Sequence, residues 1–114
     1  MKVEVRVFES FKKAAKPLIK KYRSFLDDLS VLEADILENP EMGTSLGHNA
    51  FKIRLKVKSK GKGKSGGARV ISYLDKAFLS TKSKKIIVNL ITVYDKSEKE
   101  NITDLELRKL IESL

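Results

Sequence analysis

The side chains with the clearest chemical potential lie in one short segment of the chain. Residues 52–69 contain eight basic side chains and no acidic one, namely Lys52, Arg54, Lys56, Lys58, Lys60, Lys62, Lys64 and Arg69. The first seven occupy consecutive even positions, so those on an extended strand would project from one face. Such dense like charges repel one another unless an anion lies between them, and a nucleic-acid backbone supplies that anion. The pattern therefore indicates a polyanion-binding surface.

The excess charge of the whole chain is concentrated in this segment. The protein has 24 Lys and Arg against 15 Asp and Glu, a net charge of +9. Without residues 52–69 the chain is close to neutral. A solvated, mobile hairpin would also carry many lysines and glycines, and this interpretation stays open beside polyanion binding.

The stretch GKGKSGGAR, residues 61–69, contains the last part of a phosphate-binding loop motif. That motif needs a glycine five positions before its Gly-Lys-Ser, where this chain has Lys58. It also needs a helix after the loop, whereas a strand pattern follows here. A nucleotide-binding loop is therefore rejected. The glycines instead predict a turn that adopts positive φ angles and allows the backbone to approach a ligand closely.

The composition excludes several other kinds of site. A chain of 114 residues is the size of one domain, residues 1–114, and can fold without disulfides or a structural metal. With no cysteine and one histidine, a disulfide scaffold, a cysteine nucleophile and a zinc cluster are excluded. We expect no metal site and no cofactor. No signal peptide or membrane-spanning segment is recognisable, which predicts a soluble, cytoplasmic protein without a membrane partner.

The N-terminal half predicts one strand and two helices. Alternating valines predict a strand over residues 2–8. Apolar residues at helical spacing predict one helix over 10–29, with a kink or a late start at Pro17. Capping-box spacing predicts a second, shorter helix over 30–37. Residues 40–49 are predicted to be a loop.

The C-terminal half predicts three strands and one helix. Alternation or apolar content predicts strands over 51–58, 68–74 and 86–94, the last as the central strand. A polar connection covers 76–85, and a capping box starts the last helix near Thr103. The expected fold is α+β: a mainly antiparallel four-stranded sheet with two N-terminal helices and a C-terminal helix packed on it.

Several side chains outside the lysine row are candidates for the same surface. Arg69 begins the strand after the glycine turn, so its guanidinium could reach the basic face and bind a phosphate bidentately. Tyr73 has the same parity and could stack on a base or be a core residue. His48 precedes the basic strand and could reach the site or be an ordinary loop residue. Asp95 could orient Lys96 or be a turn residue.

Two stretches of the sequence resemble a known family of toxins. They are NAFKIRLKVKSKGKGKSGGARVISYL and IIVNLITVYDKSEKENI, and the order of the elements matches over essentially the whole chain. The chain resembles the RelE/ParE superfamily, in particular its RelE- and HigB-like branch. The resemblance implies a toxin-antitoxin system in which the toxin is an endoribonuclease that cuts mRNA on the ribosome. It also implies a cognate antitoxin protein that neutralises the toxin.

The resemblance also implies a set of site residues. Lys52 and Arg54 on the strand before the glycine turn would lie in the active site, and Arg69 would contact the scissile phosphate. Lys96 corresponds to a basic residue after the last strand. The tyrosine usual in the RelE type falls near Ile102 here, so Tyr94 or Tyr73 is the candidate substitute. The additional RNA-binding candidates are Lys56, Lys58, Lys62, Lys64, Tyr73 and His48.

RNA cleavage without a metal needs a base for the 2′-hydroxyl, stabilisation of the phosphorane and an acid for the 5′-oxygen. One histidine excludes a paired-histidine mechanism. Mutual repulsion of clustered cations favours a neutral amine, which makes Lys52 the candidate base. Arg54 and Arg69, with Lys64 as a third candidate, would stabilise the transition-state charge. Lys96 or Tyr94 would protonate the leaving oxygen.

Two other functions fit the same sequence. One is a ParE-like gyrase inhibitor, which shares the fold but has a protein target and lacks nuclease chemistry. The other is a non-catalytic RNA-binding module. The apolar stripe from Phe11 to Leu29 is best interpreted as core, and any exposed remainder of it could receive an antitoxin helix.

Overall fold

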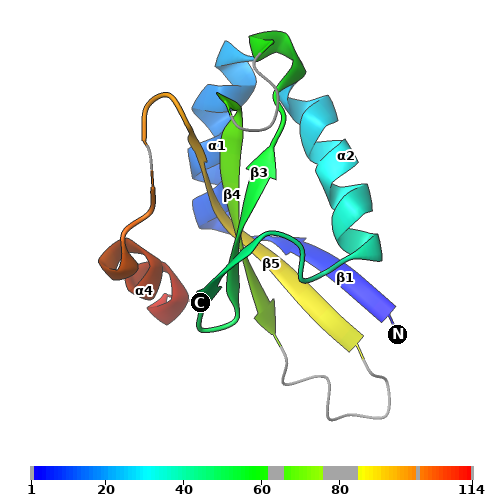
Figure 1. Cartoon of the computed structure of the whole chain (residues 1–114), viewed down its shortest axis with the longest axis vertical. Coiled ribbons are helices and arrows are strands. Elements are labelled where there is room, and N and C mark those ends of the chain that lie inside the picture. The colour runs from blue at the N-terminus through cyan, green and yellow to red at the C-terminus, as the bar shows by residue number, and fades with distance from the viewer. Residues whose placement is uncertain (1, 62–65, 76–84, 100, 114) are drawn as a thin grey trace.

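A five-stranded sheet with helices on both faces forms the protein (Figure 1). The computed structural model describes residues 2–61, 66–75, 85–99 and 101–113. Its elements are β1 (Lys2–Val7), α1 (Glu9–Lys21), α2 (Phe25–Glu38), β2 (Thr44–Gly47), β3 (Ala50–Leu55), the 3-10 turn η1 (Lys58–Lys60), β4 (Ala68–Asp75), β5 (Lys85–Asp95) and α4 (Asp104–Glu112). The α+β class is confirmed.

The sheet has the strand order β1-β5-β4-β3-β2. β1 pairs with β5 in parallel, and the other three pairings are antiparallel. The prediction of four strands was therefore wrong, because β2 lies inside the predicted loop 40–49. β5 was predicted as the central strand, but β4 holds the middle position and β5 lies between β4 and β1. Both strands are interior, so both are rich in apolar residues.

A two-residue turn creates the unpredicted strand β2. His48 and Asn49 join β2 to β3 with φ angles of 54° and 62°. Two successive residues of positive φ match the twist of a hairpin, and asparagine tolerates this conformation better than most residues. The asparagine directly before the basic strand was the available signal for this hairpin.

The two N-terminal helices form a hairpin that breaks earlier than predicted. Instead of one helix over 10–29, α1 ends at Lys21 and α2 begins at Phe25. The helix starts before Pro17 and continues past it, so the late start was wrong. Ser30, the predicted cap, lies inside α2, where its hydroxyl donates to the carbonyl one turn earlier. Both helices bury residues in the same core, so the apolar spacing continues across the break. The spacing therefore does not predict where α1 ends.

The basic strand ends sooner than its alternation predicted. β3 stops at Leu55, so Lys56 lies beyond the strand and Lys58 lies in η1. The Lys58 N–H donates to the buried carboxylate of Asp28 at 3.2 Å, and the next backbone N–H donates to Ser24 Oγ at 2.9 Å. Side chains from the start of α2 therefore draw the chain out of the sheet. Of the predicted basic row, only Lys52 and Arg54 lie on the strand.

Each face of the sheet has its own apolar core. α1 and α2 pack on one face, and their core includes Phe11, Phe25 and Leu32. α4 packs on the other face through Leu107, against Ile71. The Thr103 capping box at the start of α4 is confirmed. No helix in the described part of the chain is long and apolar enough to cross a membrane.

Candidate active site

Three polar side chains lie in one row across β3, β4 and β5. Arg54 and Arg69 are Cα partners, and Arg69 and Tyr94 are Cα partners in the next pairing. Directly paired residues project from the same face of a sheet, with Cα atoms about 5 Å apart. The row Arg54–Arg69–Tyr94 is therefore a continuous polar strip of about 10 Å across the face that α4 partly covers.

The two arginines of the row differ sharply in exposure. Arg54 is exposed, whereas Arg69 is only 5% exposed and donates to the carbonyl of Ala68 at 3.1 Å. Burial lowers the pKa of Arg69, and the positive charge of Arg54 lowers it further. Both effects disfavour the guanidinium cation unless an anion approaches it. The pair is therefore suited to receive a phosphate.

Tyr94 supplies a protonated hydroxyl at the end of the row. Burial raises the pKa of Tyr94, although Arg69 and the nearby backbone of Ile102 oppose the shift. The hydroxyl is buried and has no hydrogen-bond partner in the described part of the structure. Lys99 Nζ lies 5.7 Å from the centre of the ring. Such a hydroxyl can donate a hydrogen bond or a proton at neutral pH.

The segment before α4 brings two more polar side chains, those of Asn101 and Lys99, beside the row. Lys52, two residues before Arg54 on β3, donates from Nζ to Asn101 Oδ1 at 3.1 Å. Lys99 forms an ion pair with Glu106, which closes the capping box of α4. Lys99 lowers the pKa of Glu106 and keeps it ionised. The chain from β5 to α4 is thus tied to the same side of the site.

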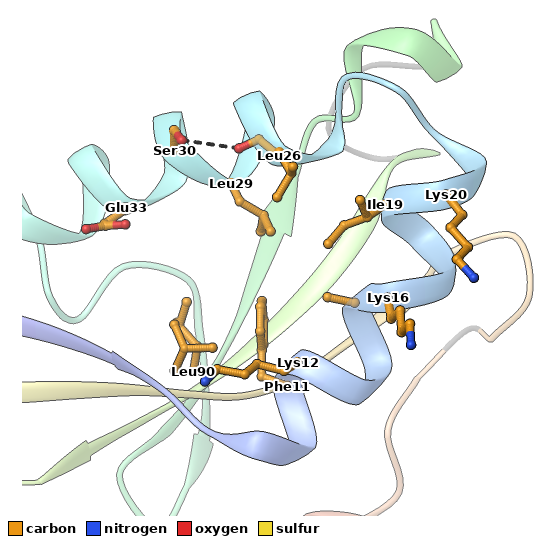
Figure 2. Close-up of a pocket in the computed structure, with 12 residues that line it drawn as sticks. Phe11, Lys12, Lys16, Ile19, Lys20, Leu26, Leu29, Ser30, Glu33 and Leu90 are labelled. Carbon is orange, nitrogen blue, oxygen red and sulfur yellow. Dashed lines mark hydrogen bonds between the residues drawn. The ribbon is translucent and has the colours of Figure 1, made fainter.

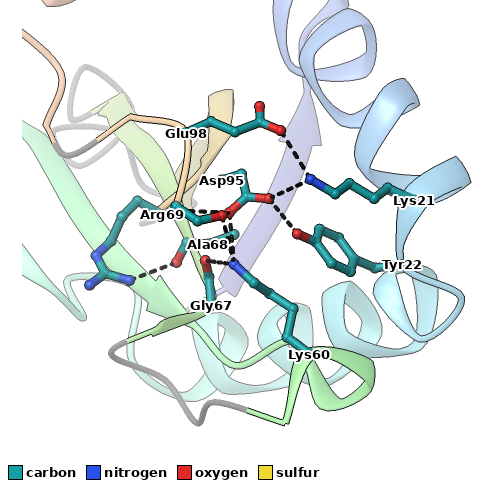
Figure 3. Close-up of polar contacts among 9 residues, drawn as sticks. Lys21, Tyr22, Lys60, Gly67, Ala68, Arg69, Asp95 and Glu98 are labelled. Atoms are coloured by element: carbon teal, nitrogen blue, oxygen red, sulfur yellow. Dashed lines mark hydrogen bonds and ion pairs between the residues drawn. The ribbon is translucent and has the colours of Figure 1, made fainter.

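A buried ion-pair network lies on the opposite face of the same strand ends (Figure 3). Lys60 Nζ donates to Asp95 Oδ1 at 2.7 Å and to the carbonyl of Gly67 at 3.2 Å. Tyr22 donates to Asp95 Oδ2 at 2.6 Å, and Ser97 donates to Oδ1 at 2.6 Å. The side chains of Lys60 and Asp95 are 6% and 1% exposed. The network therefore joins α1, η1, β4 and β5 beneath the row.

The carboxylate of Asp95 is charged despite its burial. Burial alone would raise the pKa of Asp95, but hydrogen bonds from Lys60, Ser97 and Tyr22 hold it well below the usual 3.8. A lowered folded-state pKa stabilises the fold above the unfolded value, and this contribution is lost as pH falls below 3.8. The stabilisation that ionised Asp95 gives to the strand ends is thus lost in acid.

We expect Asp95→Asn to remove this pH dependence. The difference in unfolding free energy between wild type and variant should shrink by about 1 kcal/mol from pH 7 to pH 3, because the wild type loses its advantage in acid. Urea unfolding of both proteins at pH 7 and pH 3 measures this difference. Asp35→Asn, at an exposed position of α2, is the matched control. A constant difference for Asp95→Asn would contradict the assignment.

Gly67 is required where it stands because β3 leaves no room for a side chain. A Cβ on Gly67 would lie 2.1 Å from the carbonyl oxygen of Leu55. The glycine turn thus approaches the backbone of β3, where a ligand had been expected. Gly61 has a positive φ of 71°, but Gly67 does not, so the prediction was wrong for Gly67, and Gly63 lies outside the described residues.

The architecture has a counterpart among known proteins. No protein-family model matches the sequence. The E. coli toxin RelE, solved in the free state as a variant with two arginines changed to alanine, is similar over 100% of this chain and 99% of that one, with a TM-score of 0.57. The chain has the RelE fold. At 17% identity the likeness to RelE concerns the fold, and the expected RelE resemblance is confirmed at that level.

Within the RelE fold, other predicted residues lie away from the row. Tyr73 pairs with Ala50 and packs in the α4 core, about 13 Å along β4 from Arg69. His48 lies in the β2–β3 turn beside Arg108 of α4. Neither residue joins the row.

The described lysines of residues 56–64 also lie away from the row, in different parts of the structure. Lys56 and Lys58 lie beside α2, and Lys60 is buried against Asp95. Lys62 and Lys64 lie outside the described residues. The prediction that strand alternation carries the basic side chains of residues 52–58 to one face was therefore wrong for Lys56 and Lys58, since β3 ends at Leu55.

Lys96 follows β5 directly and is half-buried. Its backbone N–H donates to the carbonyl of Gly67 at 3.1 Å, which holds it beside the start of β4. Asp95 was expected either to orient Lys96 or to be a turn residue. Its Oδ1 accepts the backbone N–H of Ser97 at 2.9 Å, which agrees with a turn residue, and it also binds Lys60. Lys99 and Asn101 were missed, because their contacts depend on how the chain returns towards α4. Within the described ranges, no group of three or more histidine, cysteine or acidic residues could hold a metal.

Proposed function

We propose that the protein is the toxin of a type II toxin-antitoxin system and acts as an mRNA endoribonuclease. The observation that carries the proposal is the row Arg54–Arg69–Tyr94, which places two cations and a protonated hydroxyl on one face of the sheet. The RelE fold supports the same conclusion. A ParE-like gyrase inhibitor would not need this row.

In the proposed reaction the 2′-hydroxyl of RNA attacks the adjacent phosphorus and the 5′-oxygen leaves. Arg54 would bind the phosphate first because it is exposed. Arg69 would then stabilise the extra negative charge of the phosphorane, after neighbouring side chains move enough to admit the phosphate. A cation already removed from water acts strongly on a developing charge.

The proton transfers are assigned to the two ends of the site. Tyr94 would give its proton to the 5′-oxygen, because its raised pKa keeps the hydroxyl protonated. Lys52 would take the proton of the 2′-hydroxyl, with Asn101 orienting its amine. Lys96 and Lys99 would add positive potential beside the phosphate.

Replacing Tyr94 by phenylalanine should separate catalysis from stability. The buried hydroxyl makes no hydrogen bond in the described part of the chain, so its removal should leave the melting temperature unchanged or slightly raised. Cleavage should fall about 100-fold because the general acid is lost. Thermal unfolding and single-turnover cleavage measure the two effects. Unchanged cleavage would remove Tyr94 from the mechanism.

Cleavage of a labelled mRNA, with and without programmed ribosomes, tests the activity. We expect cleavage that depends on the ribosome, with the ribosome-bound mRNA as substrate. A supercoiling assay with gyrase is run in parallel. Inhibition of gyrase without RNA cleavage would establish the ParE-like alternative, and salt-sensitive RNA binding without cleavage would establish a non-catalytic module.

The proposal includes a cognate antitoxin protein. We expect a small adjacent gene to encode it, and expression of the toxin alone to arrest growth. Coexpression of the neighbouring gene should relieve the arrest. Harmless expression of the intact chain would contradict the proposed toxin function.

A further inference from the structure

Lys99 lies where its charge can act on Tyr94. Its ammonium nitrogen lies over the phenol ring, 5.7 Å from the ring centre. The hydroxyl of Tyr94 is buried and makes no hydrogen bond within the described part of the chain. Because burial disfavours the charged phenolate, a cation at this distance changes how readily the phenol loses its proton.

The two carboxylate oxygens of Glu106 have different partners. Oε1 accepts the backbone N–H of Thr103 at 3.1 Å and closes the capping box of α4, whereas Oε2 forms the ion pair with Lys99. The side chains of Lys99 and Glu106 are 37% and 43% exposed, so water screens their charges only in part. The first turn of α4 therefore fixes the carboxylate, and the carboxylate holds the ammonium over the ring.

Charged groups face Tyr94 from β4 and from the side of α4. Arg69 is its direct partner on β4, and Lys99 and Glu106 lie towards α4. Burial raises the pKa of Tyr94 most strongly. Arg69 and Lys99 lower this pKa, and Glu106 raises it. The pair of Lys99 and Glu106 therefore brings two opposed charges to the same phenol.

On the side of α1, a pocket of about 310 Å³ lies between this helix and the end of β5. Tyr94 and Lys99 line it beside three other charged residues, namely Lys21, Asp95 and Glu98. These three pair with one another or with Lys60. Three further lysines of α1 line a separate pocket between α1 and α2 (Figure 2), namely Lys12, Lys16 and Lys20. Lys99 is thus the cation that the fold places over the ring.

We propose that Lys99 is a positioning residue for the proton transfer from Tyr94. Its ammonium, held over the ring by Glu106, stabilises the negative charge that develops on the phenol oxygen as the proton leaves. A proton donor that is more acidic transfers its proton more readily to the leaving oxygen. Because Glu106 belongs to the first turn of α4, the docking of this helix is coupled to the acidity of Tyr94.

The catalytic consequence rests on the proposed function, whereas the effect on Tyr94 rests on the geometry of the protein alone. Carbon-13 NMR of protein labelled at tyrosine Cζ follows the titration of its three phenols, and Tyr94→Phe assigns the signal. Lys99→Met should move the titration midpoint of Tyr94 to higher pH, because a stabilising cation is lost. Glu106→Gln should move it to lower pH, because an anion is lost while glutamine still closes the capping box.

Matched variants distinguish this electrostatic effect from a change of packing. Lys109→Met and Glu112→Gln, at exposed positions of α4, should leave the midpoint of Tyr94 in place. Lys99→Arg keeps a cation and should return the midpoint close to that of the wild type. Looser packing around the ring would move the midpoint in the same direction in Lys99→Met and Glu106→Gln. Shifts in the same direction, or no shift in either variant, would overturn the proposal.

Single-turnover cleavage of ribosome-bound mRNA tests whether Lys99 acts through Tyr94. Lys99→Met should lower the rate about tenfold in the wild-type background. In the Tyr94→Phe background it should cost less than about twofold, because the proton that Lys99 influences is absent. A tenfold loss in both backgrounds would mean that Lys99 acts on the phosphate directly, which overturns the proposal. Absence of cleavage by the wild type would refute the proposed function, and the NMR titration would still decide whether Lys99 acts on Tyr94.

Discussion

Arg69→Ala should lower the single-turnover rate of mRNA cleavage about 1000-fold, the largest loss expected from any one substitution. The arginine is buried in the middle of the row, where few water molecules screen its charge. Removing one such preorganised group costs about 3–4 kcal/mol of transition-state stabilisation. Cleavage of ribosome-bound mRNA under single-turnover conditions measures the change.

Two control variants distinguish this role from a general loss of charge or structure. Arg69→Lys keeps the charge but loses the planar bidentate donor, so it should recover only part of the rate. Arg6→Ala removes an arginine of edge strand β1 that pairs with Glu4, and should have little effect. Wild-type cleavage by a folded Arg69→Ala protein would refute the assignment of the site.

Lys60→Ala should produce the largest loss of stability, about 3–5 kcal/mol in the free energy of unfolding. The substitution leaves the buried carboxylate of Asp95 without its closest cation and with only the half-exposed Lys21 ammonium, 3.8 Å from Oδ2, as an ion-pair partner. Removing the main partner of a buried charge is strongly destabilising. The substitution also removes the donor that binds the carbonyl of Gly67. Chemical denaturation at neutral pH measures the loss.

A double variant tests whether the loss comes from the charge on Asp95. Lys60→Met with Asp95→Asn removes both charges and should be more stable than Lys60→Ala. Lys58→Ala, at an exposed lysine of the same turn, should change the unfolding free energy by less than about 0.5 kcal/mol. Equal stability of Lys60→Ala and wild type would contradict the buried ion pair.

Local patterns predicted much of the fold and part of the site. Strand alternation placed Lys52 and Arg54 on one face, and the glycine turn placed Arg69 on the neighbouring strand. These inferences succeed because side-chain direction in a strand depends on residue parity. The start of α4 was equally predictable from the sequence, because the Thr103 capping box involves only neighbouring residues.

Contacts between distant segments explain what the sequence did not reveal. Lys60 has the same parity as the exposed lysines, but its ammonium group meets Asp95, which lies 35 residues later. The break between α1 and α2 is held by Tyr22, whose hydroxyl binds the same carboxylate. Each of these features depends on which distant residues the completed fold brings together, and the local spacing of residue types does not predict those contacts.

The chemical ends of the cleaved RNA test the central claim most directly. If the 2′-hydroxyl attacks and the 5′-oxygen leaves with a proton from Tyr94, wild-type protein should produce a 2′,3′-cyclic phosphate and a 5′-hydroxyl on ribosome-bound mRNA. Mass spectrometry of the fragments identifies both ends. Fragments that carry a 5′-phosphate, or no cleavage by folded protein, would contradict the account.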